Sequence, residues 1–357
     1  MNRVYKVLVV GVGNMGSAHA RAYSKIDQFE LVGLVARTPE RRKKLSLELG
    51  NIKEYDNFDI ALKDSKPDVV SINTYTESHK EYAVKSLKSG AHIFIEKPLA
   101  ENIEDAEEII NEAKKQNKKI VVGYILRHHP TWKKFISISQ GLGSPLVMRM
   151  NLNQQSSEDQ WEVHKKLMNS TSPIVDCGVH YVDVMCQMTE SRPVRVSGIG
   201  AQLTNELPKD KINYGHLQVT FEDGSVGWYE AGWGPMMSET AFFVKDVVGP
   251  LGSASIVAAE AGSRGKSSDV DAHCQTERIL LHRSHRNEEG ELEAKDEYID
   301  LEDEPDHDEL CRREQVFFLD GITGKADLTE HQNSAIRASE IVLAADESFR
   351  SGKTLNL

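Results

Sequence analysis

Short apolar runs and longer amphipathic stretches alternate over the first third of the chain. The apolar runs predict strands, at residues 4–10, 31–36, 69–73, 92–96 and 119–124. Between them, apolar residues recur every three or four positions and predict helices, at residues 15–26, 40–49, 78–89 and 103–117. Strands that alternate with helices are typical of βαβ units and a mostly parallel sheet. We therefore expect an α/β domain over residues 1–125.

The pattern changes after residue 126 to longer strands with alternating apolar and polar positions. In NYGHLQVTFEDGSVGWYEAGW, residues 213–233, two such strands flank a hairpin turn at residues 222–225. Residues 328–353 have the pattern of a long amphipathic helix that stops at Gly352. We expect a second, α+β domain over residues 126–357 with an antiparallel or mixed sheet, whose last helix is free to pack back on the first domain.

The net charge of −12 changes this picture little, because it is local. Residues 288–309 hold thirteen acidic residues and one lysine, and acidic and basic residues balance in the rest of the chain. Nucleic acid or an anionic membrane as a partner would require a basic face. The apolar runs are also too short to span a bilayer. We expect neither partner, and we expect the acidic segment to form a solvated strand edge and loop.

The cysteines indicate a reducing compartment. Cys177, Cys186, Cys274 and Cys311 are scattered and form no C-x-x-C pair. The first predicted strand begins at residue 4, which leaves no room for a signal peptide. We therefore expect a cytoplasmic protein.

Two sets of side chains resemble metal ligands when each is viewed alone. The first set is His128 and His129, and the second is His273, Cys274, His282 and His285. Neither set has a known ligand spacing, so we expect no metal site.

The stretch VLVVGVGNMGSAHA, residues 7–20, places a G-x-G-x-x-G pattern between a predicted strand and a predicted helix. Gly11 permits the tight turn, Gly13 lets the backbone approach a pyrophosphate, and Gly16 lets helix and strand pack closely. The helix N-terminus, with Asn14 and Met15, offers free N–H groups to phosphates. We predict a dinucleotide site here.

The end of the second strand bears on which dinucleotide is bound. An acidic residue about 20 positions after the glycines would bind the ribose hydroxyls of NAD, but Ala36 stands there, followed by Arg37 and Thr38. A guanidinium can pair with a 2′-phosphate, which a carboxylate would repel. Arg41 and Arg42 are alternatively the solvated face of a helix. The pattern favours NADP(H), with Arg37 as its ligand and NAD(H) as the alternative.

Two further strand ends carry polar side chains. In VVSINTYTESHKEYA, residues 69–83, we expect Asn73, Thr74 and His79 to face the cofactor, because ligands in such sheets lie beyond the carboxyl ends of the strands. The alternative is that His79 is a surface residue behind a helix cap. In HIFIEKPLA, residues 92–100, the chain leaves the sheet at an ion pair and a proline.

In the second half, NSTSPIVDCGVHYVDVM, residues 169–185, predicts a helix that is capped by Ser172 and continues from Pro173. Asp176 and His180 are four positions apart and share a face of that helix. A carboxylate beside an imidazole can fix its tautomer, which suits a general base near neutral pH. The alternative is an ordinary surface pair.

The glycine turn, EKPLA, GYILRHHP (residues 123–130) and DCGVHYVDV (residues 176–184) occur in this order. Together they resemble the Gfo/Idh/MocA oxidoreductase family, and EQVFFLDGI (residues 314–322) and SFRSGKTLNL (residues 348–357) extend the resemblance over the whole length. The resemblance implies a Rossmann domain, followed by a domain with a large, open, mostly antiparallel sheet. It also implies an active site between the two domains.

Carried over by position, the resemblance assigns Lys97, Asp176 and His180 to the family's catalytic triad and to substrate binding. It places Arg127 near the nicotinamide or the substrate. Tyr75 stands where many members have proline, and NSTSPIVD lacks the usual glycine-rich lead-in, so details of the pocket wall are open. Glu96, Lys97 and Pro98 are expected beside the cofactor.

The implied activity is reversible oxidation of a secondary hydroxyl of a sugar or cyclitol, with hydride transfer to the nicotinamide. A homodimer or homotetramer that forms through the second-domain sheet is the implied assembly. Two alternatives stay open: a non-catalytic NADP-binding sensor of the same fold, and a reductase of another carbonyl or imine substrate.

Overall fold

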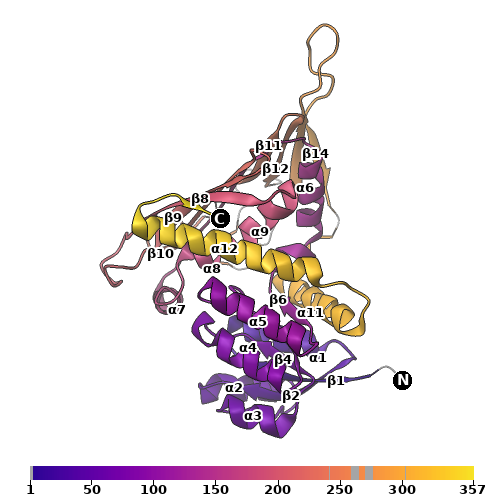
Figure 1. Ribbon diagram of the computed structural model, residues 1–357, viewed down its shortest axis with the longest axis vertical. Coiled ribbons are helices and arrows are strands. Elements are labelled where there is room, and N and C mark those ends of the chain that lie inside the picture. Colours follow the sequence, from indigo (N-terminus) through magenta and orange to yellow (C-terminus); the bar gives the residue numbers. More distant parts are fainter. Residues whose placement is uncertain (1–2, 241, 259–264, 270–275, 302) are drawn as a thin grey trace. The chain divides into compact units, whose positions relative to one another are not determined.

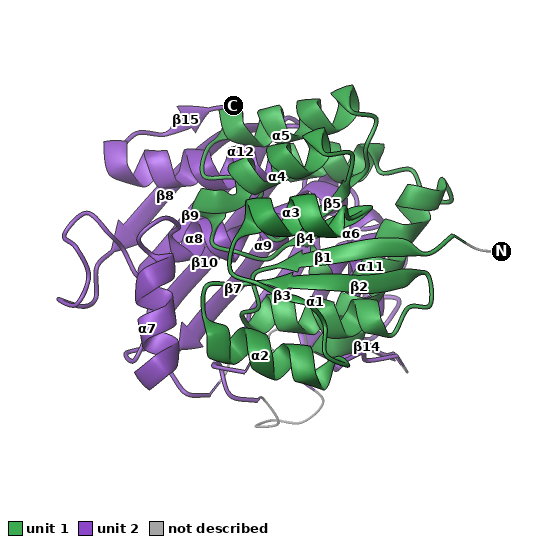
Figure 2. Ribbon diagram, turned by 90° about the horizontal axis from the view of Figure 1, so that it is seen from below, with its two compact units in different colours: residues 1–125, 307–336 green, residues 126–306, 337–357 purple. Residues whose placement is uncertain are grey.

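The computed structural model describes residues 3–240, 242–258, 265–269, 276–301 and 303–357. The chain divides into two compact units, which Figure 2 shows in different colours. Unit 1 consists of Met1–Ile125 and His307–Ile336, and unit 2 consists of Leu126–Asp306 and Arg337–Leu357. The chain thus leaves unit 1 after residue 125, as the sequence pattern suggests, but residues 307–336 return to it.

Unit 1 contains a six-stranded parallel sheet in the order β3-β2-β1-β4-β5-β6. Figure 1 labels β1, β2, β4 and β6 of this sheet, together with helices of the same unit. The strands are β1 (Tyr5–Val10), β2 (Phe29–Val35), β3 (Glu54–Tyr55), β4 (Val69–Ile72), β5 (His92–Ile95) and β6 (Ile120–Val122). The helices that connect them are α1 (Asn14–Ser24), α2 (Pro39–Glu48), α3 (Phe58–Ser65), α4 (His79–Lys88) and α5 (Ile103–Lys115). The predicted α/β class is confirmed. The sequence pattern missed β3 and α3, since a two-residue strand and an eight-residue helix are too short for periodicity to reveal them.

The core of unit 1 includes β4, β5 and β6. All residues of these strands are buried except His92, which is half-buried. Asn57 and Asn102 cap α3 and α5, accepting hydrogen bonds from the N–H groups of Ile60 and Asp105. The returning helix α11 (His307–Thr323) packs against α1, and its Phe318 is fully buried in the same core. The next helix, α12 (Thr329–Ser351), contributes residues to both units.

The described residues of unit 2 form a nine-stranded sheet in the order β14-β13-β12-β11-β7-β10-β9-β8-β15. The strands are β7 (Val147–Gln155), β8 (Pro193–Ala201), β9 (Tyr214–Phe221), β10 (Val226–Gly234), β11 (Lys245–Gly249), β12 (Gly252–Val257), β13 (Arg278–Arg283), β14 (Glu297–Asp300) and β15 (Leu355–Asn356). Only β10 and β7 pair in parallel. The predicted hairpin is confirmed as β9 and β10, and the sheet is mixed and mostly antiparallel.

Helices cover one face of this sheet. They are α6 (Pro130–Gln140), α7 (Glu158–Leu167), α8 (Pro173–Asp176) and α9 (Gly178–Thr189). Tyr229 of β10 stacks on Tyr181 of α9, with ring centroids 4.9 Å apart. On the other face of neighbouring strands, Val226, Val147 and Val248 stand side by side, 39%, 43% and 42% exposed. The open face predicted for this sheet is therefore present.

The acidic segment is part of the sheet edge, as predicted. Its strand β14 pairs with β13, and Arg278–Asp300 and Arg283–Glu297 ion pairs of 3.0 Å and 2.8 Å bridge the two strands. These pairs neutralise part of the local negative charge. None of the described helices combines the length and the apolar character needed to cross a membrane.

Candidate active site

The glycine turn between β1 and α1 has the geometry that its three glycines predict. Gly11 has a φ of 87°, and a Cβ there would lie 2.3 Å from the carbonyl oxygen of Asn73. A Cβ on Gly16 would lie 1.9 Å from the carbonyl oxygen of Gly11, whereas a Cβ on Gly13 would meet nothing within 4 Å. Gly11 and Gly16 are thus required by the fold of the turn. Gly13 instead leaves its surface open, at the position where the backbone would approach a pyrophosphate.

Gly13 is also the N-cap of α1, and no side chain caps this helix end. Asn14 is exposed and Met15 half-buried in the first turn. The free N–H groups of this turn are the donors that a phosphate requires.

The end of β2 presents one arginine to solvent and uses another in the fold. The Arg42 guanidinium donates a hydrogen bond to the carbonyl oxygen of Ala36 and pairs with Glu54 at 3.2 Å. Arg37 and Thr38 are exposed, and Arg37 forms no ion pair with any described residue. Arg37 is therefore available to a ligand at the end of this strand, whereas Arg42 is a structural residue.

The side chains after β4 mainly hold the turn itself. Asn73 donates from Nδ2 to the carbonyl oxygen of Ser71 at 3.0 Å, and its backbone N–H donates to Val10 of β1 at 2.7 Å. The Thr74 and Ser78 hydroxyls lie 2.7 Å apart. These contacts fix the turn at the carboxyl end of β4, one strand away from the glycine turn.

His79 is fully buried rather than exposed at the surface. Its Nδ1 lies 2.9 Å from the carbonyl oxygen of Pro98 and its Nε2 lies 3.0 Å from that of Thr74. Burial, the largest cause, lowers the pKa of His79, so the ring is neutral and carries a single N–H. The ring lies between the turns after β4 and β5, and its single N–H can donate to only one of these two carbonyl oxygens at a time. Direct contact of His79 with a cofactor stays a prediction.

Glu96 and Lys97 follow β5 directly, at the same edge of the sheet. Glu96 is 5% exposed, and its Oε1 lies 2.7 Å from Nε2 of His19 in α1. Its Oε2 accepts a 3.2 Å hydrogen bond from the backbone N–H of Lys97, which is half-buried. The Lys97–Pro98 peptide bond is cis. Sequence reasoning missed His19, although its position three residues after the last glycine of the turn was a usable signal.

In unit 2, the predicted cap is present and the predicted helix is divided. The Ser172 hydroxyl accepts from the N–H of Val175 at 3.4 Å, and Pro173 begins α8. The single helix expected through His180 is wrong, because Cys177 separates α8 from α9. Asp176 is the last residue of α8 and is 9% exposed, while His180 is half-buried in the first turn of α9.

Asp176 is nearly buried and lies beside other buried side chains. The Cys177 thiol lies 3.6 Å from its Oδ2, and Tyr229 is completely buried nearby. Burial raises the pKa of the Tyr229 phenol well above its usual value, and the neighbouring Cys177, Tyr181 and Asp176 raise it further. Tyr229 therefore keeps its proton and is a neutral neighbour of Asp176.

Arg127 forms a bidentate ion pair with Asp183 of α9, a residue that sequence reasoning did not single out. The two N–O distances are 2.8 Å and 2.6 Å, and the Asp183 side chain is 1% exposed. Gln187 donates to the same carboxylate at 2.9 Å. Asp183 thus holds the guanidinium in a fixed orientation, and contact of Arg127 with cofactor or substrate stays a prediction. An acidic residue within the apolar run VDVM was the available signal.

The histidines that resembled metal ligands have other partners. His129 caps α6, accepting at Nδ1 from the N–H of Thr131, and its Nε2 lies 3.5 Å from Glu304. His282 lies 2.9 Å from Asp296. His273 and Cys274 lie outside the described residues.

Family models match both parts of the chain. A model described as "Oxidoreductase family, NAD-binding Rossmann fold" matches residues 5–124, and the "GFO/IDH/MocA C-terminal domain" matches residues 134–245. UDP-N-acetylglucosamine 3-dehydrogenase of Acidithiobacillus ferrooxidans is 27% identical over 61% of this chain and 64% of its own length. Myo-inositol 2-dehydrogenase of Thermotoga maritima is 29% identical over 41% and 44%, and the NAD(+)-dependent scyllo-inositol 2-dehydrogenase of Bacillus subtilis is 24% identical over 65% and 68%. The chain is thus aligned with less than two thirds of the first two relatives.

Solved structures share the fold over nearly the whole length. The Acidithiobacillus ferrooxidans enzyme has a TM-score of 0.75 at 21% identity, covering 98% of both chains. Scyllo-inositol dehydrogenase of Lactobacillus casei, with bound NAD(H) and scyllo-inositol, has a TM-score of 0.76 at 19% identity, covering 99% of both chains. With its glycine turn, its EKP strand end and its two matched domains, the chain belongs to the Gfo/Idh/MocA family of oxidoreductases.

Proposed function

We propose that this protein is a nicotinamide-dependent dehydrogenase that reversibly oxidises a secondary hydroxyl of a sugar or cyclitol to a ketone. One observation carries the proposal: Lys97 follows β5 at the sheet edge where the glycine turn lies, with only β4 between the two strands. A cation at that edge can stabilise negative charge on an oxygen beside the nicotinamide.

The residues have separate roles in this mechanism. Bound NAD(P)⁺ supplies the hydride acceptor. The imidazole of His180 takes the hydroxyl proton, and Asp176 stabilises the imidazolium that forms. The Lys97 ammonium donates a hydrogen bond to the reacting oxygen and stabilises its developing negative charge. The near-complete burial of Asp176 strengthens its interaction with the imidazolium, because charges interact more strongly where water is excluded.

For the cofactor, we propose a preference for NADP(H). The support is the exposed Arg37 beside Ala36, where a ribose-binding carboxylate would otherwise stand. NAD(H) is the alternative, since the Bacillus subtilis relative is named as NAD(+)-dependent and the Lactobacillus casei structure contains NAD(H).

For the assembly, we propose a homodimer or homotetramer that forms through the open face of the unit 2 sheet. The aligned Val147, Val226 and Val248 on neighbouring strands support this proposal, because contiguous exposed apolar side chains favour a partner surface.

The test is a substrate panel with NADP⁺ and NAD⁺ in parallel at alkaline pH, followed by absorbance at the wavelength of the reduced nicotinamide. The panel includes myo-inositol, scyllo-inositol, glucose 6-phosphate and UDP-N-acetylglucosamine, the compounds for which relatives of the chain are named. We expect turnover of at least one polyol or sugar. Tight NADPH binding without turnover of any alcohol, ketone or imine would instead favour the sensor. Oxidation of NADPH or NADH by an imine or an unrelated carbonyl alone, in a parallel assay with reduced cofactor, would favour the other reductase.

A further inference from the structure

The carboxylate of Glu96 connects a buried histidine to the backbone of Lys97. Its Oε1 lies 2.7 Å from Nε2 of His19, and its Oε2 accepts from the N–H of Lys97 at 3.2 Å. His19 is fully buried, with its ring centroid 4.5 Å from that of Phe94 in β5. The ring therefore has little freedom to move away from the carboxylate.

A second residue fixes the tautomer of His19. Gln315 of α11 donates from Nε2 to Nδ1 of His19 at 3.0 Å. Because Nδ1 accepts this bond, the ring proton of a neutral His19 is on Nε2, where it is donated to Glu96. Three segments far apart in sequence thus form one hydrogen-bonded chain, from Gln315 through His19 and Glu96 to the backbone of Lys97.

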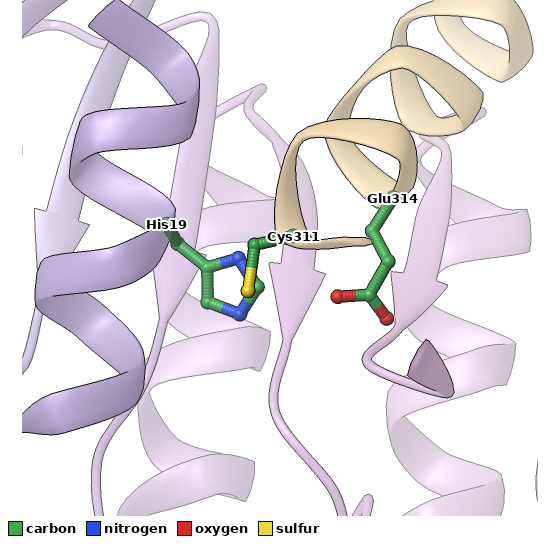
Figure 3. Close-up of side chains that lie close together, drawn as sticks. All are labelled: His19, Cys311 and Glu314. Atoms are coloured by element: carbon green, nitrogen blue, oxygen red, sulfur yellow. The ribbon is translucent and has the colours of Figure 1, made fainter. Parts of the chain in front are cut away.

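Packing around the chain confines the carboxylate and keeps further charge away. A Cβ on Gly123, after β6, would lie 3.2 Å from both oxygens of Glu96, so the carboxylate fills the space that this glycine leaves. Glu314 and Cys311 project from α11 beside His19 (Figure 3). Burial, with the charge of Glu96 as a second cause, raises the pKa of Glu314 well above its usual value. Glu314 therefore keeps its proton and adds no second negative charge.

We propose that His19 and Gln315 are positioning residues for Lys97, acting through the Glu96 carboxylate on the backbone at which the lysine side chain begins. The inference rests on the proposed function, in which Lys97 contacts the reacting oxygen. Displacement of a catalytic group by about 1 Å can cost on the order of 100-fold in rate. A hydrogen bond that fixes the backbone of Lys97 therefore protects the reaction rate. This benefit offsets the cost of burying Glu96 and His19.

His19, Cys311 and Glu314 are also residue types that bind metal ions, and their ligand atoms lie within 4.8 Å of one another. However, both ring nitrogens of His19 already have protein partners, at 2.7 Å and 3.0 Å. These two contacts thus favour the hydrogen-bonded role of His19. One equivalent of zinc that survives dialysis in the purified protein, and is lost in Cys311→Ser, would overturn it.

The first experiment compares His19→Leu with His19→Gln, whose amide nitrogen can replace Nε2 as the donor to Glu96. On the best substrate of the panel, we expect His19→Leu to lower kcat by about 10- to 100-fold with an unchanged Kd for the cofactor. His19→Gln should recover most of this loss. His92→Leu is the matched control, because His92 lies at the other end of β5 and accepts from the N–H of Lys119. It should change stability but not kcat.

The second experiment needs no substrate and measures hydrogen–deuterium exchange at the Lys97 amide. Exchange should be faster in His19→Leu and in the milder Gln315→Met than in the wild type, and close to wild type in His19→Gln. Equal exchange and equal kcat in the two His19 variants would overturn the positioning role. If Lys97→Ala retains hydride transfer at the wild-type rate, the role of Lys97 fails, and the positioning role of His19 and Gln315 fails with it, whereas a wild type that turns over nothing in the substrate panel contradicts the proposed function itself.

Discussion

Glu96 and Asp183 are buried carboxylates, and their contacts include a basic side chain, His19 and Arg127 respectively. Burying such groups has a desolvation cost that their mutual attraction does not reliably exceed. Both contacts lie next to residues of the candidate site. We therefore infer that they fix the geometry of those residues rather than stabilise the fold. At the residue scale, these fixed partners set the positions of the residues that we propose to contact cofactor and substrate.

His180→Ala tests the proposed base. Without the imidazole, proton removal from the hydroxyl has no acceptor, and we expect kcat to fall by about 100- to 10,000-fold. The Kd for NADP(H), measured by fluorescence titration, should stay unchanged. Turnover at the wild-type rate would contradict the assignment of the base.

Arg37→Asp tests the cofactor preference. Loss of a charge-assisted hydrogen bond to the 2′-phosphate should weaken NADPH binding by about 1.5–3 kcal/mol, and the new carboxylate should favour NADH. Competitive binding of NADPH and NADH measures the change. Arg41→Asp carries the same charge change at a neighbouring exposed position and is the control. An equal effect of both variants would show that Arg37 does not hold the phosphate.

Glu314→Gln tests the buried acid of α11 through the pH dependence of stability. The folded-state pKa of Glu314 is raised, so the wild type loses stability as pH rises above the ordinary value of 4.5, by up to about 1.4 kcal/mol per pH unit. The variant side chain cannot ionise. The free energy of unfolding of the variant, relative to that of the wild type, should therefore increase from pH 5 to pH 8. Urea unfolding at both pH values measures it.

Glu309→Gln, on the same helix, should behave in the opposite way. The hydrogen bond from Arg312 is the largest cause of a lowered pKa of Glu309, and the hydrogen bond from Arg313 lowers this pKa further. The pKa is about 2. Its stabilisation is present above pH 4.5 and is lost as pH falls towards 2. If the stability difference between Glu314→Gln and the wild type did not depend on pH, this result would contradict the raised pKa of Glu314.

At the element scale, local patterns predicted most of unit 1 because each strand and helix is long enough to show its own periodicity. The predicted strands at residues 69–73 and 92–96 lie within one residue of β4 and β5. Periodicity missed β3 and α3, and it did not detect the break at Cys177 in the Ser172 helix. A four-residue helix followed by a second helix has the same apolar pattern as one continuous helix.

Gly13→Ala and Gly16→Ala separate cofactor binding from folding within one turn. A Cβ on Gly16 would collide with the carbonyl of Gly11, so Gly16→Ala should cost about 1–3 kcal/mol of stability. A Cβ on Gly13 meets open space, so Gly13→Ala should keep its melting temperature while NADPH binds about tenfold more weakly, on the order of 1.4 kcal/mol. Thermal melts and fluorescence titrations give the two readouts. Equal melting temperatures for the two variants would contradict this division.

At the scale of the whole molecule, described helices cover one face of the unit 2 sheet, and Val147, Val226 and Val248 are partly exposed on the other face. Gly227 and Tyr229 of β10 face Met185 and Tyr181 of α9, whereas Val226 points the other way. Alternation of side chains along a strand makes both faces visible in the sequence. This alternation does not show what covers each face of the sheet.

Val226→Glu tests the proposed assembly. We expect the wild type to be a dimer or tetramer by size-exclusion chromatography with light scattering, and the variant to shift towards the monomer, because a buried glutamate would lack a partner at the interface. Val163→Glu in α7 is the control, since Val163 is also 39% exposed. A monomeric wild type would show the proposed interface to be wrong.

The sequence by itself determined the Rossmann elements, the glycine turn, the strand end at Lys97 and the cap at Ser172, because these depend on residues close together in the chain. Only the tertiary structure decided which partners these residues have. His19 meets Gln315 across 296 positions, and Arg127 meets Asp183 across 56. Such contacts form when α11 returns to unit 1 and α9 packs in unit 2, and local patterns contain no information on those long-range contacts.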